Sequence, residues 1–273
     1  MPIPVPGRLA DSVRQSVVQV QGNGGSLGSG VVIDKTRVIT NAHVLRGSQI
    51  RVESWDGATL SASIVKINRS RDLALLAVPG LKANSLPLGD STLLRAGTPV
   101  FAIGNPLGFV GAVSSGVIHS TNLARWVCAD VRLAPGNSGG PLANFNGQII
   151  GINTMVVTGG LALAVPSLAV NRFLKHDDSR NLGVIVHGVQ FRDRFAILVT
   201  GIVPGSPAER SSLLLGDVLT AANGLTFTHS DDLTDAIDSA TSGLLHLEFY
   251  RGDGKTPRQV TADLTAQGAK AAA

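Results

Sequence analysis

The stretch Ala134-Pro135-Gly136-Asn137-Ser138-Gly139-Gly140-Pro141 places one serine among three glycines. Glycine has no Cβ, so Gly136 can adopt backbone angles that other residues avoid, and the amide groups of Gly136 and Ser138 can then converge. Two converging backbone amides form an oxyanion hole, which stabilises the charge that develops during acyl transfer. Gly139 and Gly140 leave room for neighbouring backbone behind the serine. The stretch therefore predicts a nucleophile loop, the alternative being a glycine–serine turn in a β protein.

Short apolar segments separated by glycine and proline turns make up the chain on both sides of this loop. We expect strands at residues 17–21, 29–33, 37–40, 50–53, 60–65, 73–78, 99–104, 111–118, 126–129, 148–153 and 161–165. Many short strands at close spacing are typical of an all-β sandwich or a pair of barrels. Helical spacing of apolar residues is limited to short segments that begin near Leu9 and Ser167.

The pattern changes in the last third of the chain. Strands are expected around 182–186, 197–203, 216–222, 244–250 and 258–264, with an Asn223-Gly224 turn and a helix capped by Ser230. This mixture indicates an α+β domain. A length of 273 residues accommodates two domains. We predict a first domain at 1–174, a polar linker at 175–180, a second domain at 181–265 and a frayed tail at 266–273.

Composition excludes several classes of function. The net charge is +4, but the basic residues are scattered and aromatic residues make up only 4% of the chain, so no nucleic-acid surface is expected. The single cysteine, Cys128, excludes an intrachain disulfide and is expected to be a small buried hydrophobe. No cluster of metal ligands is visible. The chain as given shows no signal peptide or membrane segment, so we expect a cytoplasmic location, or a periplasmic or cell-envelope one if a leader was removed.

A serine nucleophile at neutral pH needs a base, and histidine is the usual one. Six histidines are present. His43 follows a predicted strand, where a loop can present it, and His119 is the only competitor in the first domain. The base in turn needs a carboxylate that orients it. Asp72 precedes a hydrophobic strand and suits this role, although it can also be read as a strand cap paired with Arg69 or Arg71.

The three candidates occur in the order histidine, aspartate, serine, within Thr40-Asn41-Ala42-His43-Val44, Arg71-Asp72-Leu73-Ala74-Leu75-Leu76 and the serine stretch. This arrangement resembles the HtrA/Deg family of chymotrypsin-fold serine proteases. The second domain resembles the PDZ domain that these proteases carry, through Asn181-Leu182-Gly183-Val184, Val203-Pro204-Gly205-Ser206-Pro207-Ala208 and Leu215-Gly216-Asp217-Val218-Leu219. The resemblance implies a mainly β fold, with a chymotrypsin-like double β-barrel followed by an α+β PDZ domain.

The resemblance also implies roles for individual residues. His43, Asp72 and Ser138 would form the catalytic triad, and the oxyanion hole would be formed by Gly136, Asn137 and Ser138. The residues expected to bind substrate are Leu133, Asn153, Thr154 and Met155 at the P1 pocket, and Leu161, Ala162 and Leu163 on a strand that pairs with substrate backbone. The lining is mostly apolar and predicts cleavage after small or medium aliphatic residues. An inward-pointing Arg132 would instead favour acidic ones, but an unpaired buried arginine is costly.

The implied partners follow from the two domains. The protease domain is expected to act without ATP, metal or other cofactor on unfolded or damaged proteins. The PDZ domain is expected to bind peptide C-termini or hydrophobic segments through Asn181, Leu182, Gly183 and Val184, with Arg180 adding charge or serving only as a solvated linker residue. A homotrimer is expected, although residues 1–10 lack the aromatic residues that help the family to build one. The alternative function is a weakly proteolytic or inactive peptide-binding scaffold or chaperone.

Overall fold

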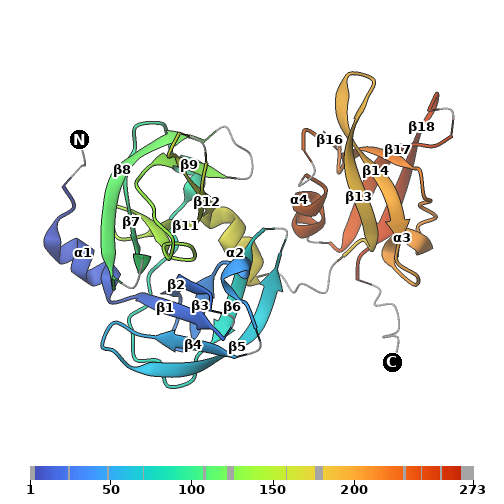
Figure 1. The fold of residues 1–273 in the computed structure, drawn as a ribbon. Helices are drawn as coiled ribbons and strands as arrows, with labels where there is room; N and C mark the ends of the chain where they lie inside the picture. The colour runs from blue at the N-terminus through green and yellow to red at the C-terminus, as the bar shows by residue number, and fades with distance from the viewer. Residues whose placement is uncertain are drawn as a thin grey trace. The chain divides into compact units, whose positions relative to one another are not determined.

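The computed structural model describes residues 4–23, 25–47, 49–69, 71–106, 109–121, 126–157, 159–175, 181–229, 232–240, 242–252 and 254–265. The chain divides into two compact units, Met1–Lys175 and His176–Ala273 (Figure 1). Most of the expected linker, the tail at 266–273 and the capping residue Ser230 lie outside the described residues. Within these described ranges, no helix is long and apolar enough to cross a membrane.

The first six strands of unit 1 form a closed barrel in the order β1-β2-β3-β6-β5-β4. The strands are β1 (Val17–Gly22), β2 (Leu27–Val32), β3 (Arg37–Thr40), β4 (Ile50–Glu53), β5 (Thr59–Asn68) and β6 (Leu73–Ala77). Their inward side chains are mostly valine and leucine, which suit a buried pleated surface. A short 3-10 helix, η1 (Ala42–Val44), follows β3 and carries His43.

Six more strands form a second closed barrel in the order β10-β11-β12-β9-β8-β7. They are β7 (Pro99–Gly104), β8 (Ala112–Ser120), β9 (Val127–Asp130), β10 (Pro141–Asn144), β11 (Ile149–Val156) and β12 (Ala162–Pro166). Strand β10 was not predicted, because its four residues begin with proline and follow the glycines of the serine loop. Pairing with β7 and β11 stabilises it nonetheless.

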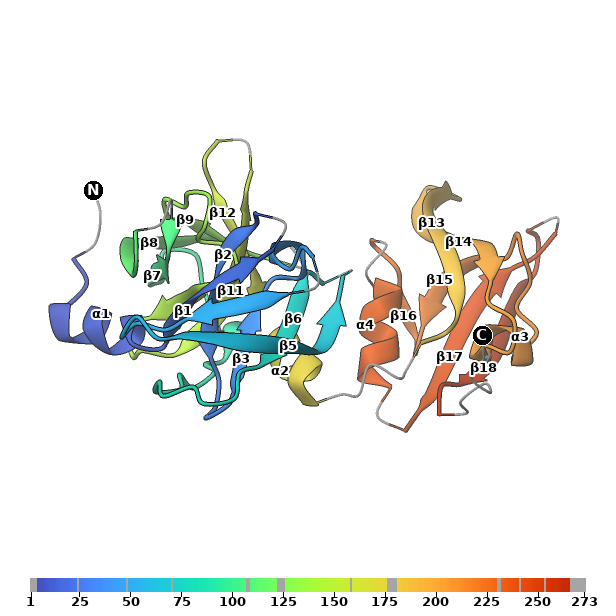
Figure 2. The same cartoon turned by 60° about the horizontal axis from the view of Figure 1, so that its bottom comes forward.

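The two barrels lie side by side and share one apolar core (Figures 1 and 2). This core joins Ile39 and Leu75 of the first barrel to Phe101 and Ile152 of the second. Helices α1 (Gly7–Arg14) and α2 (Ser167–Lys175) add Val13, Val170 and Phe173 to it. The expected burial of Cys128 is confirmed, since it is 3% exposed in β9, and desolvation raises the pKa of its thiol.

Unit 2 is a sheet in the order β13-β14-β15-β17-β18, with β16 paired to β15. Its elements are β13 (Val184–Phe191), β14 (Arg194–Ile202), α3 (Pro207–Arg210), β15 (Val218–Ala222), β16 (Leu225–Thr226), α4 (Asp232–Ser239), β17 (Leu244–Tyr250) and β18 (Pro257–Asp263). The Asn223-Gly224 turn is confirmed, with φ values of 50° and 78°. The expected class, a double β-barrel followed by an α+β domain, is confirmed.

Candidate active site

His43 and Asp72 are brought together by neighbouring strands. His43 follows β3, Asp72 precedes β6, and these strands pair with Thr40 opposite Ala74. Asp72 Oδ2 lies 2.7 Å from His43 Nδ1, and Asp72 Oδ1 accepts a hydrogen bond of 2.9 Å from the His43 amide. A carboxylate only accepts, so the proton of the neutral ring lies on Nδ1 and the lone pair is on Nε2. The His43 side chain is 46% exposed and Asp72 only 16%, so the ring can be reached by a substrate.

Asp72 is held in an unusual backbone conformation, with φ 54°. Few residues other than glycine, asparagine and aspartate adopt this left-handed region. The buried side chain of Asn41 donates hydrogen bonds of 2.8 Å to the Asp72 carbonyl and 3.0 Å to Thr154 Oγ1. Asn41 therefore connects the backbone of Asp72, the residue that orients His43, to the second barrel.

The serine loop adopts backbone angles that residues other than glycine avoid, as its glycines predict. Gly136 has φ 104°, and a Cβ there would lie 2.5 Å from the Asn105 carbonyl oxygen. The amides of Gly136 and Ser138 have no acceptor among the described residues. The Asn137 amide does have one, because it donates to the Ala134 carbonyl at 3.0 Å. The expectation that the Asn137 amide belongs to the oxyanion hole is therefore wrong in this conformation. The amides of Gly136 and Ser138 remain as the candidate donors.

The hydroxyl of Ser138 donates to the Thr154 carbonyl at 3.0 Å, and no hydrogen bond joins it to His43 in the described part of the chain. A serine hydroxyl has one proton, so this contact withholds the proton from His43. Behind the serine, Cβ atoms added to Gly139 and Gly140 would lie 2.1 Å from the Ser29 carbonyl oxygen and 2.4 Å from that of Ile103. The predicted close backbone approach is confirmed.

Only part of the predicted P1 lining has accessible side chains. Leu133 is half-buried and Met155 is exposed. The expectation for the side chains of Asn153 and Thr154 is wrong, because both are buried and engaged: Asn153 donates to the Pro141 carbonyl at 2.9 Å within the second barrel, and Thr154 accepts from Asn41, which follows β3 of the first barrel. Arg132 is exposed, as expected for an arginine that does not enter an apolar pocket.

The prediction that Ala162 and Leu163 pair with substrate is also wrong, whereas Leu161 precedes the strand and its role stays a prediction. Strand β12 lies between β11 and β9, so both of its edges are already hydrogen-bonded. Instead, the end of β11 has an edge that no described strand pairs with, since β10 pairs with β11 only as far as Ile152. Met155 and Val156 lie there, 45% and 47% exposed. Sequence patterns did not reveal this edge, because it depends on where a neighbouring strand stops.

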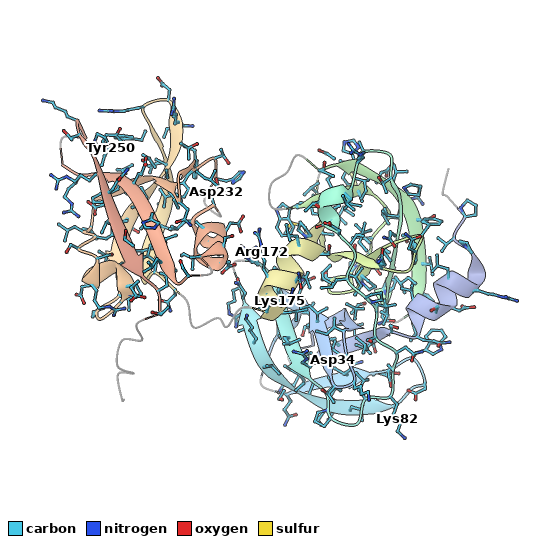
Figure 3. All side chains as sticks on the ribbon, turned by 180° about the vertical axis from the view of Figure 1, so that it is seen from behind. Asp34, Lys82, Arg172, Lys175, Asp232 and Tyr250 are labelled. Carbon is cyan, nitrogen blue, oxygen red and sulfur yellow. The ribbon has the colours of Figure 1, made fainter. Side chains whose placement is uncertain are left out.

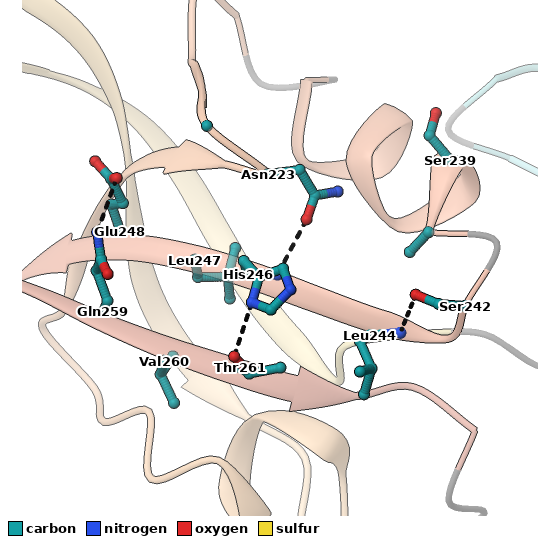
Figure 4. A pocket seen from close by; sticks show the side chains of 12 residues that line it. Asn223, Ser239, Ser242, Leu244, His246, Leu247, Glu248, Gln259, Val260 and Thr261 are labelled. Carbon is teal, nitrogen blue, oxygen red and sulfur yellow. Dashed lines mark hydrogen bonds between the residues drawn. The ribbon is translucent and has the colours of Figure 1, made fainter.

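The other histidines that the structure describes lack this combination of partners. His119 is exposed on β8, and among the described residues no carboxylate forms a hydrogen bond with its ring. In unit 2, His229 Nδ1 lies 2.6 Å from Asp232 Oδ1, at the start of α4 (Figure 3 labels Asp232). His246 lines a cavity of about 660 Å³, where its ring bonds to Thr261 Oγ1 at 2.8 Å (Figure 4). Both of these histidines belong to unit 2, whereas Ser138 belongs to unit 1.

Unit 2 presents a second set of unclaimed backbone amides. Asn181, Leu182 and Gly183 lead into β13, and in the described residues no acceptor faces their N–H groups. Gly183 has φ 75°, which favours glycine. Among the described strands, β13 pairs with β14 on one side only, so no described strand occupies its other edge. Val184 is half-buried beside it, whereas Arg180 lies outside the described residues.

The fold and this site define a trypsin-like peptidase domain followed by a PDZ domain, and comparison with known proteins agrees. Residues 28–152 match the trypsin-like peptidase domain model and residues 198–251 match the PDZ domain model. "Serine protease HTRA1" of Xenopus tropicalis is 31% identical over 86% of this chain and 59% of its own. "Probable periplasmic serine endoprotease DegP-like" of Halomonas elongata is 36% identical over 80% of this chain and 52% of its own.

Among solved structures, the "HtrA-type protease AlgW with tripeptide" superposes with a TM-score of 0.72 at 27% identity, covering 95% of this chain and 96% of that one. The chain belongs to the HtrA/Deg family of trypsin-fold serine proteases with a PDZ domain. It spans only about half to three fifths of the length of the curated relatives that it matches.

Proposed function

We propose that this chain is an ATP-independent serine endopeptidase. The observation that carries the proposal is the pair of contacts from Asp72 to His43, one to the ring and one to the backbone. Together they hold the ring with Nε2 free to accept a proton. A positioned base of this kind activates a serine nucleophile, and Ser138 lies in the glycine-rich loop that ends at the second barrel.

The reaction would proceed in two stages. The Ser138 hydroxyl leaves the Thr154 carbonyl, gives its proton to His43 and attacks the substrate carbonyl. The amides of Gly136 and Ser138 stabilise the oxyanion, and His43 returns the proton to the leaving amine. Water then repeats the sequence on the acyl-enzyme. Every group that moves a proton belongs to this chain, to substrate or to water.

Substrates would be extended, unfolded polypeptides. The free edge at Met155 and Val156 supports this, because an added strand needs an unpaired backbone on both partners. Leu133 and Met155 favour a small or medium aliphatic residue at P1. A P1-scanning peptide library tests this preference, and strong cleavage after Asp or Glu would contradict it and implicate the exposed Arg132.

The PDZ unit would bind peptide C-termini. The amides of Asn181, Leu182 and Gly183 are suited to a terminal carboxylate, and the free edge of β13 is suited to the peptide backbone. Val184 and Val186 of β13 and Ile237 of α4 are partly exposed members of one apolar cluster, and would contact the last side chain.

The cellular setting of this activity follows from the relatives alone. Several curated relatives carry the word periplasmic in their names, and we propose the periplasm for this chain as well. The cytoplasmic location expected from the sequence has no support in these comparisons. The expected homotrimer remains a prediction that light scattering of the purified protein tests.

Casein cleavage tests the central proposal. Wild-type protein is expected to degrade casein, and Ser138→Ala is expected to lose this activity while keeping its fold. The alternative, a peptide-binding scaffold, is favoured by one observation, the engagement of the Ser138 hydroxyl by Thr154. If wild type and Ser138→Ala are equally inert, with and without PDZ-binding peptides, the scaffold function is the correct one.

A further inference from the structure

The catalytic scheme makes no use of a fully buried serine of the first barrel, Ser29 in β2. The Ser29 hydroxyl donates to the Gly136 carbonyl at 2.6 Å and accepts from the Asn105 amide at 2.8 Å. Its own amide donates to the Ser138 carbonyl at 2.8 Å. One residue of the first barrel thus holds two carbonyls of the serine loop, which belongs to the second barrel.

The direction of these bonds is forced by chemistry. The Asn105 amide can only donate, so the Ser29 hydroxyl must accept there and send its single proton to Gly136. Solvent does not compete for these two hydrogen bonds, because Ser29 is 0% exposed. A buried carbonyl that lost this donor would have no water to replace it, and an unpaired buried polar group is costly.

The position of this contact matters more than its strength. The Gly136 carbonyl and the Asn137 amide belong to one planar peptide unit. Ser29 holds the carbonyl end of that unit, and Ala134 holds the amide end at 3.0 Å. The unit lies between the two peptide units that carry the Gly136 and Ser138 amides. Its orientation therefore sets the angle between those two donors.

Gly136, like Gly139 and Gly140, has more conformational freedom than the other residues of the loop. Glycine loses more backbone entropy than any other residue when it is fixed, and Gly136 is fixed at φ 104°. Within the described part of the chain, the tether that fixes it includes one side chain, that of Ser29, since the other partners are backbone groups. A single substitution can therefore remove it.

We infer that Ser29 is a positioning residue for the oxyanion hole: its hydroxyl fixes the Gly136–Asn137 peptide so that the Gly136 and Ser138 amides point at the developing oxyanion. This inference rests on the proposed peptidase function and deepens it. Ser29 touches neither substrate nor the reacting atoms. Its effect should therefore fall on the transition state and leave substrate binding unchanged.

The test compares Ser29→Ala with Ser16→Ala. Ser16 is a suitable control because its hydroxyl is also fully buried in unit 1 but has no hydrogen-bond partner in the described residues. With a cleavable peptide, Ser29→Ala is expected to lower kcat roughly ten- to a hundredfold and to leave KM within about twofold, because small misplacements of oxyanion donors cost this much. Ser16→Ala is expected to match wild type.

Two binding measurements separate positioning from a general structural role. A peptide aldehyde, which forms a tetrahedral adduct with Ser138, should bind Ser29→Ala more weakly by the same factor as kcat/KM falls. Uncleaved substrate peptide should bind Ser138→Ala and the Ser29→Ala, Ser138→Ala double variant equally. If Ser29→Ala does not fold, Ser29→Cys keeps a weak donor of similar size and should show an intermediate kcat.

The possible failures are distinguishable. A wild-type protein that cleaves no peptide contradicts the proposed function itself. An active wild type with an equally active Ser29→Ala overturns the inference about Ser29 and leaves the proposed function standing. A Ser29→Ala variant that loses kcat but retains full affinity for the peptide aldehyde also overturns it, because the oxyanion hole would then be intact.

Discussion

The buried side-chain amide of Asn41 donates a hydrogen bond of 2.8 Å to the backbone carbonyl of Asp72, the residue that holds His43. The same amide nitrogen donates a hydrogen bond of 3.0 Å to Thr154 Oγ1. The backbone carbonyl of Thr154 in turn accepts a hydrogen bond from the Ser138 hydroxyl. One asparagine thus lies between the histidine side and the serine side of the site. Its neighbours belong to both barrels, so its loss should affect both activity and stability.

Asn41→Ala should lower the free energy of unfolding by about 1–3 kcal/mol, because it leaves the Asp72 carbonyl and the Thr154 hydroxyl without their buried donor. Casein cleavage should fall at least severalfold, as Asp72 is less firmly held. Denaturant unfolding and peptidase assays measure the two effects. Asn146→Ala, on an exposed turn, is the control and should change neither quantity. An Asn41→Ala variant with wild-type activity would show that Asp72 needs no support.

Asp72→Asn should preserve the fold and reduce kcat by about four orders of magnitude, since an amide that donates to Nδ1 favours the wrong histidine tautomer. Peptide cleavage rates over a series of enzyme concentrations provide the measurement. Asp56→Asn changes an aspartate on an exposed turn of the same barrel and should leave kcat unaltered. Loss of less than about tenfold at Asp72 would assign the orienting role elsewhere.

Gly136→Ala should abolish activity and destabilise unit 1, because the new Cβ would lie 2.5 Å from the Asn105 carbonyl oxygen at a φ of 104°. Gly57→Ala provides the matched control. Gly57 also has a positive φ, 82°, but nothing lies within 4 Å of its Cβ position. Gly57→Ala should cost only about 1–2 kcal/mol of stability through backbone strain and should stay active. Equal activity of the two variants would contradict a fixed oxyanion hole.

The unclaimed amides at Asn181, Leu182 and Gly183 predict that unit 2 prefers peptides with a free C-terminal carboxylate. A peptide ending in an aliphatic residue should bind at least about tenfold more tightly as the free acid than as its C-terminal amide, because charge-assisted hydrogen bonds to backbone amides are lost. Fluorescence anisotropy with the Ser138→Ala protein measures this without cleavage. Equal affinities of the two peptides would exclude carboxylate recognition.

Asp232 should make unit 2 sensitive to acid. Burial alone would raise its pKa, but hydrogen bonds from the Thr228 and His229 amides and the Thr228 hydroxyl, with the charge of His229, lower the pKa below its ordinary 3.8. A carboxylate with a lowered folded pKa stabilises the fold above its unfolded pKa, about 3.9, and this stabilisation is lost as pH falls through the folded value.

The unfolding midpoint of unit 2 should therefore drop below about pH 4 in wild type. Asp232→Asn should be less stable at neutral pH but should show a shallower decline in acid. Thermal unfolding followed by circular dichroism from neutral to acidic pH measures both slopes. Asp193→Asn, on the exposed β13–β14 turn, should keep the wild-type slope. Parallel acid profiles for Asp232→Asn and wild type would contradict this assignment.

Local features of the sequence were sufficient for much of this molecule. The strand alternation, the Asn223-Gly224 turn and the glycines around Ser138 depend on neighbours within a few residues, and most of them were predicted, although β10 and β16 were missed and the strand expected at 182–186 is β13 (Val184–Phe191). The order of His43, Asp72 and Ser138 pointed to the double-barrel fold before any coordinates. The turn, the strand pattern and the glycines are short-range preferences of backbone or side chain, whereas the double barrel was implied by the family resemblance that the order of His43, Asp72 and Ser138 carries.

Tertiary structure alone decided which backbone groups remain free. It occupied the Asn137 amide, closed both edges of β12 and left the edge at Met155 open. It also joined Ser29 to Gly136, 107 positions further along the chain. These outcomes depend on where one strand ends beside another and on how two barrels meet. Hydrogen bonds between distant segments leave no periodic pattern in the sequence, so they could be seen only once the chain was folded.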